Sequence, residues 1–278
     1  MDAVSLLAAA VVGAALAVSG ATLQSVLRNP LAEPYILGLV GGASLGVAGA
    51  FLAGWAEASA CVVPLAAFSG ACLSLALVCA VSALAARRAG TRGLAGGTVI
   101  VAGFVAGSFT CSLQMLALAY ATPEQAAAAF KWVWGDLRQA SPAAVPWAAA
   151  AVGAALAALY ARNRQLNALA LGEETARSLG VNVRRTQLAA LAATSLATAA
   201  SVALAGAVGF LGLIVPHVVR RLAGANHRVC LPVCAGAGAV FLVAADGAAR
   251  LFPGHLPVGV VCALTGAPFF FWLLARKG

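Results

Sequence analysis

Apolar residues fill this chain in long stretches without charged side chains, each long enough to form a membrane-spanning helix. A helix needs about 20 apolar residues to cross the hydrocarbon core of a bilayer. Charge-free stretches cover residues 3–27, 34–56, 58–86, 93–123, 139–161, 186–219 and 251–275, and a further apolar segment, 229–249, is interrupted only by Asp246. This pattern predicts an all-α, polytopic membrane protein with a single domain over residues 1–278.

The stretch 186–219 is too long for one crossing. Glycine and proline interrupt it at Gly206, Gly209, Gly212 and Pro216. Irregular backbone at membrane depth is tolerated only where protein or water satisfies its polar groups. We therefore predict one helix that ends near Ala205, a broken, glycine-rich segment at 206–216 and a short return helix that ends near Leu222. Counted in this way, the chain has about nine transmembrane helices.

Composition supports the same class of protein. The chain is 63% hydrophobic and only 9% charged, whereas soluble domains carry about 25% charged residues. Too little polar surface remains to cover a water-soluble globule, which excludes a soluble enzyme, a disordered tail and a nucleic-acid-binding module. The seven cysteines lie inside apolar stretches without zinc-type spacing. We expect no metal site, and interpret His217 and the pair Cys230 and Cys234 as structural residues.

Membrane topology explains the net charge of +9, because cytoplasmic loops are enriched in Lys and Arg. With nine crossings and a cytoplasmic C-terminus, only Lys131, Arg138 and Arg250 of the 17 Lys and Arg residues lie outside. Without the reversal at the glycines, the positive charges divide more evenly between the two sides. We therefore predict a multi-pass protein of the cell membrane with a cytoplasmic C-terminus and no nucleic-acid partner.

The cytoplasmic loop 162–185 carries the clearest candidate for a docking surface. Its central part, Leu171–Gly180, has two glutamates near its start and a glycine at its end. Acidic residues stabilise the N-terminus of a helix, and glycine favours its C-terminal end. We predict a short amphipathic helix that docks another protein, with a merely solvated helix as the alternative. The candidate docking residues are Gly172, Glu173, Glu174, Ala176, Arg177, Leu179 and Gly180.

Small residues form a second group of candidates. Gly38, Gly42 and Gly46 recur every four residues, and small residues on one helix face let membrane helices approach closely. Within the broken segment the corresponding candidates are Gly209, Gly212 and Pro216. For this group we expect helix packing, with the lining of a translocation pathway as the alternative.

A few polar and aromatic side chains stand out in the apolar stretches. Asp246 and Arg250 are four residues apart, a spacing that favours an ion pair on a helix, and we expect a structural or docking role for them. Gln24 is expected to form a hydrogen bond between helices. Trp132 and Trp134 are interpreted as interfacial anchors.

Two absences bear on the mechanism. A P-loop requires Gly-x-x-x-x-Gly-Lys-Ser/Thr, and the two lysines, Lys131 and Lys277, lie in no such context. The chain is therefore not expected to be an enzyme that hydrolyses ATP. A proton-coupled carrier usually places several carboxylates or histidines within the membrane, whereas here Asp246 stands almost alone.

In their order and spacing, these segments resemble the permease subunits of ABC importers for vitamin B12, ferric siderophores and haem, the FecCD type. The likeness covers almost the whole chain, although each short motif alone is weak. It rests on Val12 to Gln24, Arg28-Asn29-Pro30-Leu31-Ala32-Glu33-Pro34, Leu37 to Gly46, Trp132 to Leu137, Leu171 to Gly180, Gly209 to His217, Leu256 to Gly259 and Thr265 to Phe270.

This resemblance implies a homodimer of ten-helix subunits around a central pathway. Two cytoplasmic ATPase subunits, which carry ATP and Mg, would dock at residues 172–180, and this chain itself would bind no cofactor. An extracytoplasmic binding protein would deliver an iron–siderophore, haem, vitamin B12 or a similar metal chelate. Outer arginines help to hold that protein in the family, so the resemblance makes Arg138 and Arg250 the docking candidates here.

One departure from the family pattern lies at the start. Family members carry a further helix and an Arg-x-Pro-Arg element before the sequence that matches Leu6–Ala17, and this chain lacks both. We hypothesise a chain shortened by a late start site, with a natural nine-helix variant as the alternative. Two other functions stay open: a secondary carrier that needs no ATPase, and a membrane scaffold that transports nothing.

Overall fold

The computed structural model describes residues 2–88, 96–252 and 256–275, and within these residues all regular secondary structure is helical. The α-helices are α1 Ala3–Val26, α2 Leu39–Leu52, α3 Val62–Arg88, α4 Gly96–Leu118, α5 Pro123–Val133, α6 Ala144–Tyr160, α7 Asn163–Ala170, α8 Glu173–Ser178, α9 Val183–Ala205, α10 Leu211–Ala223, α11 His227–Ala249 and α12 Val258–Ala275. Three short 3-10 helices are η1 Pro34–Leu37, η2 Trp55–Glu57 and η3 Leu137–Gln139.

Five of the described helices are long and apolar enough to cross a membrane, namely α1, α3, α4, α9 and α11. The pair α6 and α7 passes the same criterion together, but its two members are bent by 62°. α2 and α12 are apolar and shorter. Each apolar stretch predicted from the sequence contains one of these helices, and the short helix α10 follows α9. The prediction of an all-α, polytopic membrane protein is confirmed.

Two of the predicted crossings are shorter than a full span. α2 has 14 residues and α10 has 13, against the about 20 that a crossing needs. Both helices follow backbone that is not α-helical, at 27–38 for α2, where only the short 3-10 helix η1 is regular, and at 206–210 for α10. The candidate functional site is built where these two segments meet.

Besides α8, which was predicted, the helices α5 and α7 lie outside the predicted apolar stretches. α5 begins with a capping box in which the hydroxyl of Thr122 accepts from the N–H of Gln125 and the side chain of Gln125 accepts from the N–H of Thr122. The amide nitrogen of Gln125 also donates to the carbonyl of Phe51, which fixes α5 against the end of α2. α7 lies inside the segment 162–185 that was predicted as a loop with one helix. Both are short helices with polar faces, which a search for apolar stretches does not detect.

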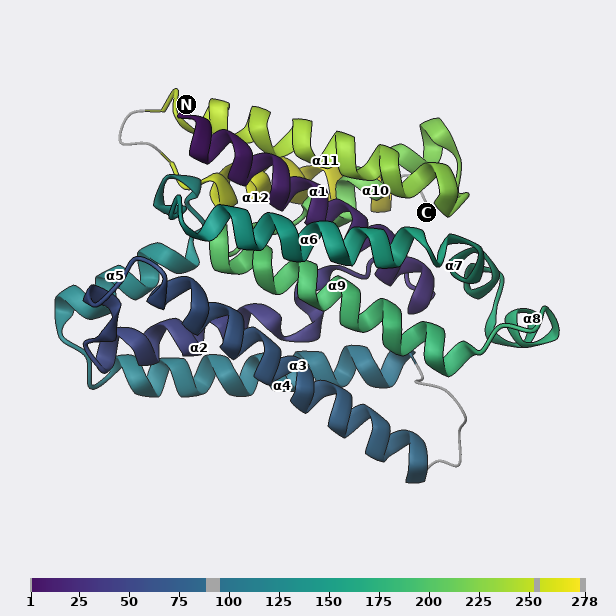
Figure 1. Ribbon diagram of the computed structural model, residues 1–278, viewed down its shortest axis with the longest axis horizontal. Coiled ribbons are helices and arrows are strands. Elements are labelled where there is room, and N and C mark those ends of the chain that lie inside the picture. The colour runs from purple at the N-terminus through teal and green to yellow at the C-terminus, as the bar shows by residue number, and fades with distance from the viewer. Residues whose placement is uncertain (1, 89–95, 253–255, 276–278) are drawn as a thin grey trace.

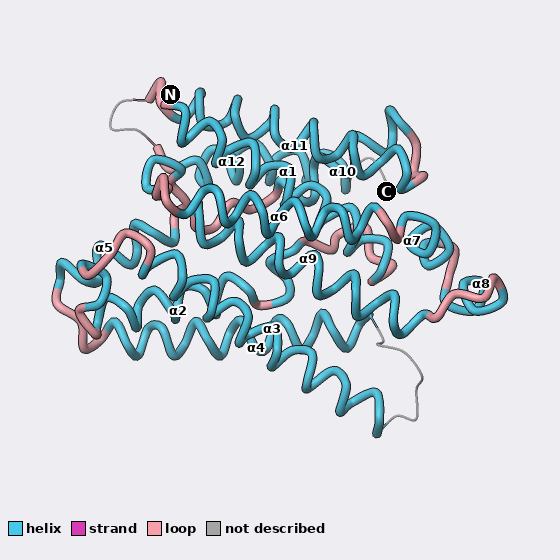
Figure 2. The backbone as a smooth tube through the Cα atoms, viewed as in Figure 1, coloured by secondary structure: helices cyan, strands magenta, loops and turns pink. Residues whose placement is uncertain are grey.

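The bundle is built around α1 (Figure 1). α1 packs against α11, α9, α10 and α6, and from Val12 to Val26 nearly every residue is buried. The N-terminus and α5 lie at one end of the long axis, and α7 and α8 lie at the other. We call these the α5 end and the α8 end. Most connecting loops lie at the two ends, and a few lie among the helices in the interior (Figure 2).

Pairs of facing glycines allow the central helices to touch backbone to backbone. A Cβ added to Gly20 of α1 would lie 2.0 Å from the carbonyl oxygen of Gly212 in α10, and one added to Gly13 would lie 2.2 Å from that of Gly238 in α11. Lipid provides no hydrophobic force between helices, so close packing of small residues holds such contacts together. α1 is therefore in direct contact with α10, the helix that follows the break.

Gly42 and Gly46 pack as predicted, but Gly38 does not belong to the same helix face. A Cβ on Gly42 would lie 2.4 Å from the carbonyl oxygen of Gly70, and one on Gly46 would lie 2.2 Å from that of Ala66, both in α3. Gly38 precedes α2 with a φ of +72°, a left-handed conformation that glycine adopts without steric cost. Gly38 also packs closely, since a Cβ there would lie 2.9 Å from the carbonyl oxygen of Gly103 in α4, so all three glycines serve packing and Gly38 also serves a turn.

Candidate functional site

The break between α9 and α10 is the first part of the site. α9 ends at Ala205, as predicted, and α10 begins at Leu211. Gly206 and Phe210 both have positive φ values, +67° and +65°, and such a conformation is uncommon for a non-glycine residue. The irregular segment is shorter than the predicted 206–216, because helical structure resumes at Leu211 and continues through Pro216. Gly209 lies in the irregular segment, and Gly212 lies in the first turn of α10.

Two side chains from the segment after α1 satisfy the backbone of this break. The N–H of Phe210 donates to Oε1 of Glu33 at 2.6 Å, and the N–H of Val208 donates to the hydroxyl oxygen of Tyr35 at 2.8 Å. A buried N–H without an acceptor costs about 1–3 kcal/mol. Glu33 and Tyr35 therefore act as a clasp that stabilises the break, a role that the sequence analysis, which placed Glu33 in a polar turn, did not predict.

A proline inside α10 leaves a second backbone group that needs a hydrogen bond from a side chain. Pro216 has no N–H, so the carbonyl of Gly212, four residues earlier, loses its helical donor. The amide nitrogen of Gln24 in α1 donates to this carbonyl at 3.1 Å. Its amide oxygen accepts from Nη1 of Arg220 at 2.6 Å. The predicted interhelical hydrogen bond of Gln24 is confirmed, and it explains why α10 tolerates Pro216.

At the α8 end, α8 confirms the predicted helix and shortens it to six residues, Glu173–Ser178. Gly172 and Gly180 flank it with φ values of +122° and +78°, which explains the glycines at both ends of the motif. Glu173 pairs with Arg177 at 2.6 Å and accepts from Nε2 of Gln187 in α9 at 3.1 Å. Glu173 thus attaches α8 to the membrane helix α9.

The candidate docking residues of α8 divide between two faces. Ala176 and Gly172 are buried, and Glu173 is half-buried. Glu174, Arg177 and Leu179 are exposed, with Leu179 63% accessible, and Leu171 just before α8 is 70% accessible. The outward face therefore combines apolar side chains with one carboxylate and one guanidinium, a composition that suits contact with a protein.

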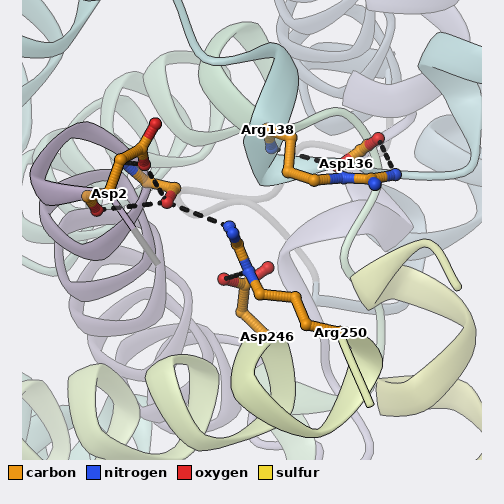
Figure 3. Close-up of polar contacts among 6 residues, drawn as sticks. Asp2, Asp136, Arg138, Asp246 and Arg250 are labelled. Carbon is orange, nitrogen blue, oxygen red and sulfur yellow. Dashed lines mark hydrogen bonds and ion pairs between the residues drawn. The ribbon is translucent and has the colours of Figure 1, made fainter. Parts of the chain in front are cut away.

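At the α5 end, Arg138 and Arg250 are both held in ion pairs (Figure 3). Arg138 makes a two-bond contact with Asp136, from Nη2 to Oδ2 at 2.9 Å and from Nε to Oδ1 at 3.0 Å. These hydrogen bonds raise the pKa of Arg138 above its usual value. Nε of Arg250 pairs with Asp246 at 2.8 Å, as the four-residue spacing predicted.

Arg250 also connects α11 to the first turn of α1. Its Nη2 donates to the hydroxyl of Ser5 at 2.9 Å, and Ser5 in turn contacts Asp2, the N-cap of α1. Hydrogen bonds from Ser5 lower the pKa of the Asp2 carboxyl. Figure 3 shows the side chain of Arg250 pointing toward Asp2. The start of α1 is thereby anchored to the end of α11.

The two tryptophans predicted as interfacial anchors occupy different environments. Trp134 is 57% accessible, whereas Trp132 is only 7% accessible and belongs to the core. Trp132 lines a cavity of about 370 Å³ together with Asp136 and residues of α9. The interpretation of Trp132 as an anchor is wrong, because α5 turns this side chain inward against the end of α9.

Cys230 and Cys234 lie on one face of α11 with their sulfur atoms 3.8 Å apart. Both are buried. In the part of the chain that the structure describes, no group of three or more His, Cys, Asp or Glu side chains is arranged to hold a metal ion. His217 lies edge-on to the ring of Phe269, with ring centroids 6.1 Å apart.

Apolar helices around a central helix, a break held by side chains inside the bundle and a polar helical segment at one end together define an all-helical, polytopic membrane protein. The model of the FecCD transport family matches residues 3–276. The chain therefore belongs to the FecCD transport family. It is a permease subunit of the cell membrane and not itself the ATPase.

Two relatives show how far the similarity extends. The chain is 40% identical to the cobalamin import system permease protein BtuC of Halobacterium salinarum, over 96% of this chain and 70% of that protein. It is 38% identical to the vitamin B12 import system permease protein BtuC of Escherichia coli, over 98% of this chain and 81% of that protein.

Solved structures support the same fold. An inward-facing structure described as a metal-chelate type ABC transporter aligns with a TM-score of 0.88 and 28% identity, over 98% of this chain and 85% of that one. PsaBC from Streptococcus pneumoniae aligns with a TM-score of 0.63 and 17% identity, over 96% and 88%. The second likeness concerns the fold alone.

Proposed function

We propose that this chain is the membrane-spanning permease of an ATP-driven importer for vitamin B12. The observation that carries the proposal is similarity over nearly the whole chain to B12 import permeases from an archaeon and a bacterium. The broken α9–α10 segment supports it, because non-helical backbone inside a membrane is expected beside a substrate pathway or a tightly packed crossing. Iron–siderophores, haem and similar metal chelates are the competing substrates within the family.

In the proposed assembly, two copies of the chain pair around the pathway, and two ATPase subunits dock at the α8 end. That end carries the segment 162–185 and faces the cytoplasm together with the C-terminus. ATP and Mg are bound by the ATPase subunits. A binding protein delivers the substrate at the α5 end. The skewed distribution of Lys and Arg supports this orientation.

The proposal is tested by uptake in proteoliposomes. The permease is purified with the ATPase encoded beside it, reconstituted, and supplied with ATP inside and with radiolabelled B12 and the binding protein outside. We expect B12 uptake that stops when ATP is removed, and a complex whose mass corresponds to two permeases and two ATPases. Uptake that persists without ATP and collapses with an ion gradient would instead identify a secondary carrier. A complex that moves ferric siderophore or haem and not B12 would reassign the substrate.

The first prediction concerns ATPase docking through the outward face of α8. Glu174→Arg is expected to reduce co-purification of the ATPase by at least about tenfold, because it reverses an exposed charge at the centre of the proposed contact. The matched variant Glu173→Arg should also lower the stability of the permease itself, since Glu173 pairs with Arg177 and Gln187. Pull-down on a tagged ATPase measures the first effect, and thermal denaturation measures the second.

Docking through α8 would be disproved by full recovery of the ATPase with Glu174→Arg. The control is Glu57→Arg, which reverses a carboxylate on η2 near the start of α3, away from α8. This variant should bind the ATPase as the unmodified chain does. Loss of binding with both variants would indicate a general defect in assembly.

The second prediction concerns the binding protein at the α5 end. Arg138→Ala is expected to weaken its binding by less than about fivefold, because the charge of Arg138 is already neutralised by its two-bond pair with the buried carboxylate of Asp136 and attracts a partner only weakly. Arg250→Ala should act as weakly on binding, and it should also lower the melting temperature by releasing the first turn of α1. Titration of fluorescent binding protein onto permease in nanodiscs measures the affinity. A loss above a hundredfold for Arg138→Ala would show that this arginine dominates docking.

A further inference from the structure

Buried polar contacts connect α7, in the cytoplasmic segment, to α11 and α1. Oδ1 of Asn167 in α7 accepts from the backbone N–H of His227 at 2.9 Å and lies 2.7 Å from Nδ1 of the same residue. Because this oxygen can only accept, Nδ1 of His227 carries the proton and donates it. Nε2 then accepts from the hydroxyl of Ser25 in α1 at 2.9 Å. His227 is 2% accessible and Ser25 is 8% accessible.

The contacts continue from α1 to both ends of α10. The carbonyl of Ala21, one turn before Ser25 in α1, accepts from Nη2 of Arg220 in the last turn of α10 at 2.9 Å. Arg220 also donates to Gln24, and Gln24 donates to the carbonyl of Gly212, the one that Pro216 leaves without a helical donor. Two sets of hydrogen bonds, joined by one turn of α1, therefore connect α7 and α11 to α10.

Some buried hydroxyls, such as Ser19 of α1 with the carbonyl of Thr194 in α9, also connect helices, whereas others bond only within their own helix. Ser201 and Thr198 in α9 donate to carbonyls of their own helix, at Ala197 and Thr194. Such bonds satisfy a polar group and leave the helix free to move as a unit. Bonds between Asn167, His227 and Ser25 join three different helices, so movement of α7 relative to α1 must either break them or carry α1 along.

The elements at the two ends of these contacts are built to move as units. α7 is bent by 62° from α6, and Glu173 links the adjacent α8 to Gln187 of α9. α10 lies between the irregular segment 206–210 and Gly224, which has a φ of +85°, so it is a short helix bounded on each side by a non-helical connection. Short bodies with hinges at both ends are the usual moving parts of conformational change.

We propose that Asn167, His227 and Ser25 are positioning residues that transmit movement of the ATPase-docking segment to α1 and, through Gln24 and Arg220, to α10. This role rests on the proposed function, since it assigns a route by which ATP hydrolysis acts on the membrane helices. Removing one contact leaves the docking surface on α8 intact, so ATP hydrolysis continues while its effect on the pathway is reduced.

The test measures B12 uptake and ATP hydrolysis in the same proteoliposomes. Ser25→Ala and Asn167→Ala are each expected to keep ATP hydrolysis within about twofold and to lower the number of B12 molecules moved per ATP by about fivefold, the lower range of measured coupling between sites. The double variant should be no worse than either single variant, because both interrupt one route. The matched control is Ser201→Ala, which removes a buried hydroxyl from α9 and should leave the ratio unchanged.

A second readout separates this proposal from the function on which it rests. Hydrogen–deuterium exchange of α10 is followed in the permease–ATPase complex with and without a non-hydrolysable ATP analogue, and no substrate is needed. We expect nucleotide to change exchange in α7, α8 and α10 of the unmodified chain, and in α7 and α8 alone for Ser25→Ala. An unchanged α10 response in Ser25→Ala and Asn167→Ala, or an unchanged transport ratio, would overturn the proposed route. Absence of B12 uptake by the unmodified complex would overturn only the substrate assignment.

Discussion

Gly238→Ala is expected to lower the melting temperature of the purified protein by roughly 4–8 °C, whereas Gly236→Ala, two residues earlier in the same helix, should leave it unchanged or raise it slightly. A Cβ on Gly238 would lie 2.3 Å from the carbonyl oxygen of Gly13 and 2.6 Å from Cβ of Ala17. Backbone atoms cannot rotate away as a side chain can, so α11 must separate from α1. Overpacking of this kind costs about 1–3 kcal/mol, and a protein of this size loses about 2–4 °C per kcal/mol.

The control isolates packing from the chemistry of the substitution. Gly236 is exposed, and a Cβ there meets nothing within 4 Å. Alanine is favoured over glycine inside a helix by about 1 kcal/mol. Both variants therefore gain the same helix propensity, and only Gly238→Ala introduces a steric clash. Thermal denaturation followed by size-exclusion chromatography compares them. Equal melting temperatures for the two variants would show that α1 and α11 are not packed as closely as the structure has them.

The membrane helices, the end of α9 and one ion pair could be predicted from the sequence because they depend on local composition and spacing. Charge-free stretches locate membrane helices wherever polar side chains are too costly to bury in lipid. The end of α9 at Ala205 followed from the glycines after it, and the pair of Asp246 and Arg250 followed from their spacing. Each of these is determined by residues close together in sequence, where helical geometry alone fixes the neighbours.

Contacts between distant segments could not be predicted in the same way. Glu33 meets Phe210 and Tyr35 meets Val208 across more than 170 positions of chain, and no local pattern indicates such a meeting. One signal was available: an irregular segment inside a membrane requires partners for its N–H groups, and Glu33 was the one carboxylate in the motif of residues 28–34. The pairing of Gln24 with Gly212 could have been inferred in the same way, because Pro216 leaves the carbonyl of Gly212 without its helical donor.

The candidate docking residues of α8 also combine features that the local sequence predicts with features that only a tertiary contact determines. The glycine after α8 and its acidic first turn were predicted correctly from the motif, whereas the role of Gly172 just before α8 was not. Which of its side chains face outward depends on Gln187 in α9, because that contact turns Glu173 inward and leaves Glu174 outward. A six-residue helix has no strong preference of its own for either face, so the tertiary contact decides.

Glu33→Leu is expected to lower B12 uptake by at least about tenfold, whereas Glu33→Gln should retain uptake within about twofold. Glutamine keeps a side-chain oxygen that can accept the N–H of Phe210, and leucine has none. The unpaired N–H costs about 1–3 kcal/mol at a residue that already has a φ of +65°. The break between α9 and α10 should then lose its defined geometry, and with it the position of α10.

Tyr35→Phe provides the matched test of the other half of the clasp. It removes one hydroxyl, the acceptor of the Val208 N–H, and keeps the ring. For Tyr35→Phe we expect a loss of uptake between those of Glu33→Gln and Glu33→Leu, and a lower melting temperature. When Tyr35→Phe is combined with Glu33→Leu, the melting temperature should fall by less than the sum of the two separate effects, because both side chains stabilise one segment. Melting temperatures do not depend on the identity of the substrate. If Glu33→Gln is as damaging as Glu33→Leu in both measurements, a neutral acceptor oxygen is not sufficient and the expectation that Glu33 acts through hydrogen-bond acceptance alone is disproved.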